Sequence, residues 1–237
     1  MPGDSNGGGS RFFYRFHHYK IDIVLIAALM IVFGFLFVGL IGGAFRAIGF
    51  SWQVAMIILF GSLLGSWINI PVAKIMTQSQ VLQAQNVEFF GIVFRVPAIT
   101  QVRRPTVIAV NLGGALIPII ISVYLFITVP SILVMALISI TVVALIMYFV
   151  ARPIRGLGIA APALVAPITA ALCAIILALP PYTSYVAYVS GVLGTLIGAD
   201  FGHLKDISKS APKIAAIGGA GTFDGIFISG ILAAILA

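Results

Sequence analysis

Charged residues are scarce in this chain of 237 residues: Asp, Glu, Lys and Arg make up 8%, against about 25% in an ordinary soluble domain. Hydrophobic residues make up 61%, and the mean hydropathy is +1.19. A soluble protein of 25.0 kDa cannot hide so much apolar surface, because roughly half of its residues must face water. Disorder is excluded as well, since it requires low hydrophobicity and high net charge. The composition therefore predicts an integral membrane protein.

Cysteine is almost absent and occurs once, at Cys173, inside an apolar run. A single cysteine excludes a disulfide within the chain, and there is no CxxC or His/Cys cluster for a metal. The adjacent His17 and His18 point to different faces of a helix, so they do not form a metal pair. We expect Cys173 to be a small buried apolar residue, and we expect no metal and no cofactor.

Seven apolar runs are long enough to cross a bilayer as helices, which takes about 20 mostly apolar residues. The runs are continuous and not alternating, which is typical of membrane helices. Residues 1–20 are predicted to form a disordered tail and a basic-aromatic segment at the lipid headgroups, and residues 21–237 one membrane domain. We predict an all-α, polytopic fold with transmembrane helices at about 21–45, 53–73, 106–128, 131–150, 159–179, 183–201 and 214–236.

The basic residues are confined almost entirely to alternate connecting regions. Twelve of the thirteen Lys and Arg fall in the N-terminal segment and the second, fourth and sixth loops, and Arg46 alone lies on the other side. Because positively charged loops stay in the cytoplasm, the N-terminus is predicted inside and the C-terminus outside. The net charge of +7 is then explained by topology and contact with anionic lipid in the cell (inner) membrane, and not by nucleic-acid binding.

The longest connection between the predicted helices is a cytoplasmic loop at about 75–104. Its segment VEFFGIVFRV, residues 87–96, is rich in β-branched and aromatic residues around Gly91, which is typical of a short hairpin or an interfacial strand pair. Such an element covers the mouth of a cavity, docks a partner, pairs with a substrate strand, or serves only as a connector.

A faint internal repeat links two segments of the chain. RPTVIAVNLGGALIPIIIS (104–122) and APKIAAIGGAGTFDGIFIS (211–229) both run from a basic cluster through proline and apolar residues to Gly-Gly-Ala and then Ile-Ser. Both predicted helices enter the membrane from the cytoplasmic side, so the repeat is expected to be parallel and not inverted.

Two aspartates lie at membrane depth, where an ionisable residue costs about 2.5–3.5 kcal/mol on insertion scales and is a functional candidate by default. Asp224 is about ten residues into the last predicted helix, near the bilayer middle. Asp200 lies about five residues before Lys205, roughly 7 Å inside the cytoplasmic boundary. Their helices are joined by a short loop and are therefore antiparallel neighbours whose carboxyls can face each other. We predict Asp200 and Asp224 as the catalytic residues of an acidic site.

Glycines, asparagines and a proline accompany these aspartates within the predicted spans. The glycines allow either close helix packing or an unwound backbone that approaches a ligand. The asparagines either join helices by hydrogen bonds or bind an ion, and the proline frees a backbone carbonyl. The predicted substrate- or ion-binding set is Asn69, Asn111, Pro162, Gly198, Gly219 and Gly221.

Three segments, ARPIRGLGIA (151–160), GTLIGAD (194–200) and IGGAGTFDGIF (217–227), resemble an uncharacterised prokaryotic family of multi-pass membrane proteins, a domain of unknown function. The resemblance covers most of the chain after the N-terminal tail. It implies the fold of that family and carries no established activity.

A looser resemblance is to presenilin-like intramembrane aspartyl proteases, which place two aspartates on adjacent helices. Phe223-Asp224 is similar to their Tyr-Asp motif, Gly198-Ala199-Asp200 to their GxGD motif, and Pro162-Ala163-Leu164 matches their Pro-Ala-Leu motif. The chain departs from GxGD at positions 197 and 199, the order of the motifs is changed, and seven spans are predicted instead of nine. The resemblance implies a catalytic aspartate pair and a membrane-protein substrate.

Three functions are compatible with an acidic site in a membrane. In an aspartyl hydrolase, two carboxyls share a proton and activate water, one as base and one as acid. In a proton- or cation-coupled transporter or channel, Asp224 binds the ion near the midplane and carbonyls of a glycine-broken helix complete the site. A non-catalytic subunit of a larger membrane complex needs neither arrangement. We predict the hydrolase, and the distance between the two carboxyls distinguishes the three functions.

Overall fold

The computed structural model describes residues 19–89, 92–154, 158–206, 214–219 and 225–237. By its internal contacts the chain divides into two units, Met1–Gly39 and Leu40–Ala237, and each is described by itself. Most of the predicted tail, with His17 and His18, lies outside the described residues.

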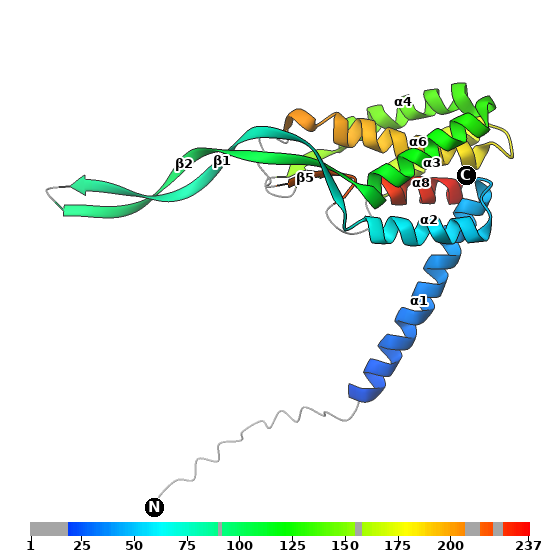
Figure 1. The fold of residues 1–237 in the computed structure, drawn as a ribbon, viewed down its shortest axis with the longest axis horizontal. Coiled ribbons are helices and arrows are strands. Elements are labelled where there is room, and N and C mark those ends of the chain that lie inside the picture. Colours follow the sequence, from blue (N-terminus) through cyan, green and yellow to red (C-terminus); the bar gives the residue numbers. More distant parts are fainter. Residues whose placement is uncertain (1–18, 90–91, 155–157, 207–213, 220–224) are drawn as a thin grey trace, which may run out of the picture. The chain divides into compact units, whose positions relative to one another are not determined.

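The protein is mostly helical, as the sequence predicts. Within the described ranges, seven helical segments follow the order of the seven predicted spans (Figure 1). Short turns of other helical types extend three of them: η1 Leu112–Leu116 leads into α3, η2 Pro130–Ile132 leads into α4, and η3 Leu196–Phe201 continues α6. The α-helices are α1 Tyr19–Ala47, α2 Trp52–Gly65, α3 Ile117–Thr128, α4 Leu133–Val150, α5 Val165–Leu177, α6 Thr183–Thr195 and α8 Gly225–Leu236.

Three helical stretches are long and apolar enough to cross a membrane: Ile23–Ala47, Pro130–Val150 and Thr183–Asp206. The other four apolar helices of the described chain are shorter. At 1.5 Å per residue, the 12 residues of α8 cover about 18 Å of a hydrocarbon layer that is roughly 30 Å thick. Length and composition indicate a membrane protein.

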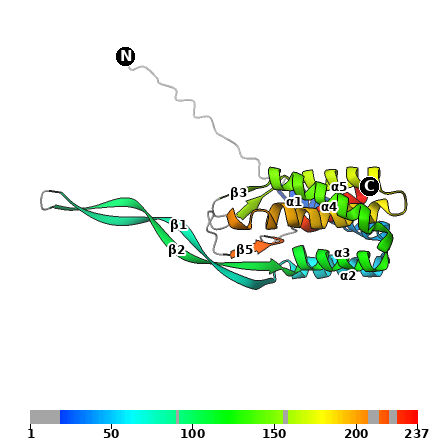
Figure 2. The same cartoon turned by 90° about the horizontal axis from the view of Figure 1, so that it is seen from above.

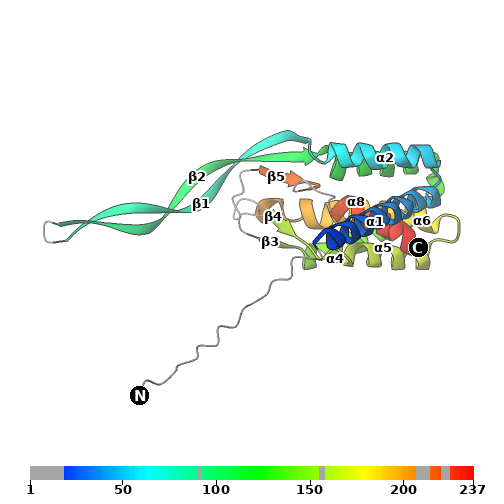
Figure 3. The same ribbon diagram turned by 90° about the horizontal axis from the view of Figure 1, so that it is seen from below.

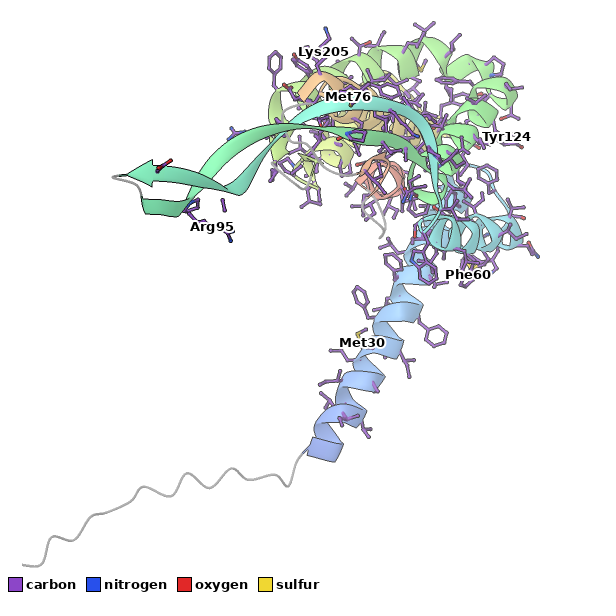
Figure 4. All side chains as sticks on the ribbon, turned by 60° about the vertical axis from the view of Figure 1, so that its left-hand side comes forward. Met30, Phe60, Met76, Arg95, Tyr124 and Lys205 are labelled. Carbon is purple, nitrogen blue, oxygen red and sulfur yellow. The ribbon has the colours of Figure 1, made fainter. Side chains whose placement is uncertain are left out.

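The first unit contains the apolar helix α1 as far as Gly39. Its large apolar side chains between Ile23 and Leu36 are 47–77% exposed, and Phe33 stacks on Phe37 with ring centroids 6.3 Å apart. Figure 4 shows Met30 and its neighbours standing out from several sides of the helix. A helix that is apolar all round is suited to lipid or to contact with other membrane helices.

The core of the second unit is a bundle of α4, α5, α6 and α8 (Figure 3). Small residues make the close contacts, as is usual between membrane helices: Ala166, Ala170 and Ala174 form the buried face of α5. The part of α1 that belongs to this unit joins the core through Phe45. Its ring centroid lies 6.2 Å from that of Tyr188 and 6.3 Å from that of Phe227.

A long two-stranded ribbon connects α2 to α3 (Figure 2). Its strands β1 (Asn69–Phe89) and β2 (Ile92–Asn111) pair antiparallel over their whole described length, with one irregularity close to the base. The strand β5 (Ile214–Ile217) pairs in parallel with β2, which gives the sheet order β1-β2-β5. A second, small sheet joins β3 (Arg152–Ile154) to β4 (Gly158–Ala160).

The strands replace parts of the chain that hydropathy assigns to helices. The helices predicted at 53–73 and 106–128 are shortened by β1 and β2, and the helix predicted at 214–236 is preceded by β5. The fold is therefore not all-α. Ile and Val favour strands, and a short apolar strand cannot be distinguished from a buried helix by hydropathy alone.

The strand pair expected within residues 87–96 is confirmed by the pairing of Val87 with Phe94 and of Phe89 with Ile92. The pairing also continues to Asn69, so the loop expected at 75–104 is the outer part of the ribbon. Cys173, expected to be buried, is only partly covered.

The internal repeat has a structural counterpart. β2 and β5 pair from Val107 with Ile214 to Val110 with Ile217, so paired residues are 107 positions apart (214 − 107). The same offset aligns residues 104–122 with 211–229. Ser122 and Ser229, which are also 107 apart, each donate a hydrogen bond to the carbonyl four residues earlier in α3 and α8. The strands of the two units are thus parallel.

Candidate functional site

Asp200 lies in η3, the π-helical turn that continues α6, and is half-buried. The turn is closed by hydrogen bonds between residues five apart, such as Gly202 N–H to Ile197 O at 2.9 Å. Single π-helical turns occur frequently at functional sites. Asp200 is therefore placed on a local irregularity of a long apolar helix.

His203 is a neighbour of Asp200 that sequence reasoning left out of the site. It is buried, its Nδ1 lies 3.1 Å from Ala199 O, and its ring centroid lies 5.1 Å from that of Tyr148 in α4. Since it follows Asp200 by three residues, both lie on one side of the helix. This spacing was the sequence pattern from which His203 could have been included in the site. No group of three His, Cys, Asp or Glu that could hold a metal occurs among the residues described.

Gly198 belongs to a row of glycines, from Gly194 to Gly202, along which α6 and η3 pack on α4. A Cβ at Gly198 would overlap the carbonyl oxygen of Ala144, and one at Gly202 would lie 2.6 Å from Tyr148 Cδ2. Both contacts join residues 54 positions apart, so the two helices run parallel here. The space left by the absent side chain of Gly198 is therefore filled by α4.

α6 and α8 run antiparallel and also touch through glycines. A Cβ at Gly191 would lie 2.8 Å from Ser229 O, and one at Gly230 would lie 2.5 Å from Val192 Cγ2. Figure 1 shows that α6 runs towards η3 whereas α8 runs the opposite way towards the C-terminus, so moving forward along α6 from Gly191 corresponds to moving backward along α8 from Ser229. The C-terminal end of α6 thus meets the N-terminal end of α8.

This register locates the start of α8 relative to Asp200. Four residues before Ser229 is Gly225, the first residue of α8, and it comes level with the beginning of η3. Asp200 is a few residues farther, within about 5–8 Å along the helix axis. Asp224 is joined to Gly225 by the chain, but it lies outside the described residues, as does Gly221.

Gly219 forms the turn that follows β5. Gly218 and Gly219 have φ angles of 80° and 138°, in a region that side chains rarely adopt. A Cβ at Gly218 would overlap that of Ala115 in η1. Gly218 and Gly219 are therefore explained by their positive φ angles, and Gly218 also by its close contact with η1.

Asn69 and Asn111, predicted in different helices, are brought together as the first pair of the ribbon. The Asn111 side-chain nitrogen donates to Ser66 O at 2.6 Å and to Asn69 Oδ1 at 3.1 Å. The Asn111 side-chain oxygen accepts from Gly114 N–H at 2.7 Å and caps η1. Both polar atoms of the Asn111 side chain are thus occupied in joining α2, the ribbon and η1.

Pro162 lies in an exposed turn directly before α5, and its carbonyl accepts a hydrogen bond from Val165 N–H at 3.3 Å. Ala163 and Leu164 are exposed as well. The structure therefore places the Pro-Ala-Leu sequence on the surface of this chain at a helix start.

Comparison with protein families agrees with the first resemblance. Residues 63–236 match the family described as "Protein of unknown function (DUF1614)", and the chain belongs to this family. No curated protein and no solved structure gives a match. The family description assigns no activity, so a function has to be argued from the chain itself.

Proposed function

We propose that the protein is an aspartyl hydrolase of the membrane, in which Asp200 and Asp224 together cleave a peptide bond of a membrane-protein substrate. The observation that carries the proposal is the antiparallel register of α6 and α8. Measured along the helix axis, it sets Gly225, the neighbour of Asp224 in the chain, within about two helical turns of Asp200.

The chemistry follows from two carboxyls that share one proton. The ionised carboxyl takes a proton from water, whose oxygen attacks the peptide carbonyl carbon, and the protonated carboxyl donates its proton to the carbonyl oxygen, which gives a tetrahedral intermediate. The carboxyl that gained the water proton then donates it to the peptide nitrogen as the C–N bond breaks, and the other carboxyl takes a proton back from a hydroxyl of the intermediate. The products are a carboxylic acid and an amine, and the carboxyl pair returns to its starting state. Close like charges keep one carboxyl protonated, because both cannot be ionised side by side. The role of His203 beside Tyr148 is to fix the turn that bears Asp200.

The test uses the full chain in lipid nanodiscs and a photoreactive peptide carrying a hydroxyethylene group, which mimics the tetrahedral intermediate. Asp200→Asn and Asp224→Asn should each reduce specific photolabelling at least tenfold, because an amide cannot share the proton. Asp206→Asn is the matched control and should label like the parent chain. Unchanged labelling of both test variants, in chains that retain the parent melting temperature, rejects the hydrolase.

The proposal includes a topology: seven spans in the cell (inner) membrane, with the N-terminus inside and the C-terminus outside. It is supported by the twelve-to-one distribution of Lys and Arg in the sequence. In a Cys173→Ala chain, Ala237→Cys should react with an impermeant maleimide in intact cells. Reaction only after permeabilisation reverses the orientation.

An ion site that includes the asparagines is less favoured. Asn111 uses its side-chain oxygen and nitrogen in the hydrogen bonds at the base of the ribbon, and one of these bonds is to Asn69. A coordinated cation would have to compete with Gly114 N–H for the Asn111 oxygen.

A further inference from the structure

The strand β1 of the ribbon has few packing partners. Apart from β2, no helix or strand of the described chain makes an extensive contact with β1. The sheet order β1-β2-β5 makes β1 an edge strand along its whole length. An isolated two-stranded hairpin is marginal in water, and an unpaired edge is a template for another strand.

The two edges of the ribbon differ in whether a further strand can pair with them. The outer edge of β2 is occupied by β5 at Val107–Val110, and farther out β2 contains Pro97, Pro105 and three arginines. Prolines and charges are the devices that block strand addition at an edge. In contrast, residues 75–87 of β1 contain no proline, no glycine and no charge.

The pairing register shows which backbone groups the open edge offers. Pro97 pairs with Ala84 and Pro105 with Met76. Since a proline cannot donate to the inner ladder, these are pairs whose backbone groups point outward. Alternate residues of β1 between them, including Leu82, therefore present their N–H and C=O groups on the outer edge. Met76 and Ala84 are exposed, and Figure 4 shows Met76 on the ribbon.

We propose that the edge of β1 from Ile75 to Val87 binds an extended, uncharged segment of another polypeptide as an added antiparallel strand. The exposed Lys74 and Glu88 border this stretch. They select a segment with a basic residue at its N-terminal end, opposite Glu88, and an acidic residue at its C-terminal end, opposite Lys74. Antiparallel addition is favoured because it is slightly more stable per residue than parallel addition. The inference does not depend on the proposed hydrolase.

A second copy of the chain fits this edge less well. Ribbons that leave the same face of a membrane in the same direction meet as parallel strands. A two-fold axis between two such strands places each residue opposite the same residue of the other copy. In a parallel ladder, however, a residue whose N–H and C=O point to the partner lies opposite a residue whose N–H and C=O point away, so the same residue cannot lie opposite itself. The partner is therefore a different polypeptide.

The probe is a fluorescein-labelled 15-residue peptide with N-terminal Lys, an uncharged Thr- and Gln-rich centre and C-terminal Glu. Its binding to the full chain in nanodiscs is measured by fluorescence anisotropy. Leu82→Pro blocks the open edge without removing an inner ladder bond. Ile99→Pro is the matched control. Ile99 is the partner of Leu82 on β2, so its replacement by proline removes an outward N–H from the β2 edge and leaves the β1 edge intact.

The expected result is at least a tenfold loss of affinity in Leu82→Pro and less than a twofold change in Ile99→Pro. The peptide with exchanged Lys and Glu should bind several times more weakly. Equal effects of the two prolines, or no binding to the parent chain, overturn the proposal. A disulfide-linked dimer of a Gln80→Cys, Cys173→Ala chain overturns it in favour of a second copy.

Discussion

The two strand–turn–helix units, residues 107–128 and 214–236, place their helices in different surroundings. In α3, Val123 and Ile127 are 48% and 72% exposed, whereas α8 is mostly buried. At the positions 107 residues later, α8 has Gly230 and Ala234, and both are buried. The comparison indicates that side-chain size determines which of the two helices is buried, because only the helix with small residues can approach α6 closely.

The largest effect is expected when the buried helix receives the residue of the exposed one. Gly230→Val copies Val123, and its Cβ would lie 2.5 Å from Val192 Cγ2 and 3.0 Å from Tyr188 Cε2. Overpacking of this kind lowers the free energy of unfolding by about 1–3 kcal/mol. The reverse exchange, Val123→Gly on the exposed helix, should cost only about 0.5–1 kcal/mol in helix propensity. Unfolding in a titration of mixed micelles measures both, and equal effects would break the comparison.

An effect of at most the same size is expected at the turns. Asn111→Gly copies Gly218 and removes the cap of η1 together with the bonds to Ser66 O and Asn69 Oδ1. We expect a loss of about 1–3 kcal/mol in unfolding free energy, since Gly114 N–H and Ser66 O are buried polar groups left without this partner. Asn69→Ala removes one of these bonds and should cost less than half as much. A larger effect at Asn69 would contradict the central role of Asn111.

The smallest effect should be equal in the two units. Ser122→Ala and Ser229→Ala each remove a hydrogen bond to a carbonyl four residues earlier in the same helix. Such bonds contribute little to helix stability, so both variants should lie within about 0.5 kcal/mol of the parent chain. A difference of more than about 1 kcal/mol between them, in the same micelle titration, would show that the equivalence stops at the strands.

Much of the helical plan can be predicted from the sequence, because long apolar runs have few alternatives. The parts that fail are apolar and short: residues 69–73, 106–111 and 214–217 form strands within runs that hydropathy assigns to helices. Their pairing joins residues far apart in the chain, which no local pattern specifies. The repeat with its offset of 107 was the sequence signal that related residues 107–110 to residues 214–217.

The site was less predictable than the helices. The sequence identifies Asp200 by its charge within an apolar helix, but it does not distinguish a glycine that faces a ligand from one that faces a helix. Gly198 is an example, since only the packing of α4 shows what fills the space beside it. Likewise, Asn69 and Asn111 were recognisable as polar, whereas their mutual hydrogen bond depends on the ribbon register.

The length of the ribbon has a consequence for where encounters occur. The 20 residues of β2, at about 3.3 Å each, extend over roughly 65 Å, about twice the thickness of a hydrocarbon layer. As the protein diffuses, the ribbon encounters other molecules at distances from the helices that the helices themselves do not reach. If the ribbon binds another polypeptide as proposed, contact along its described strands can precede contact with the helices and raise the local concentration of the bound polypeptide beside them.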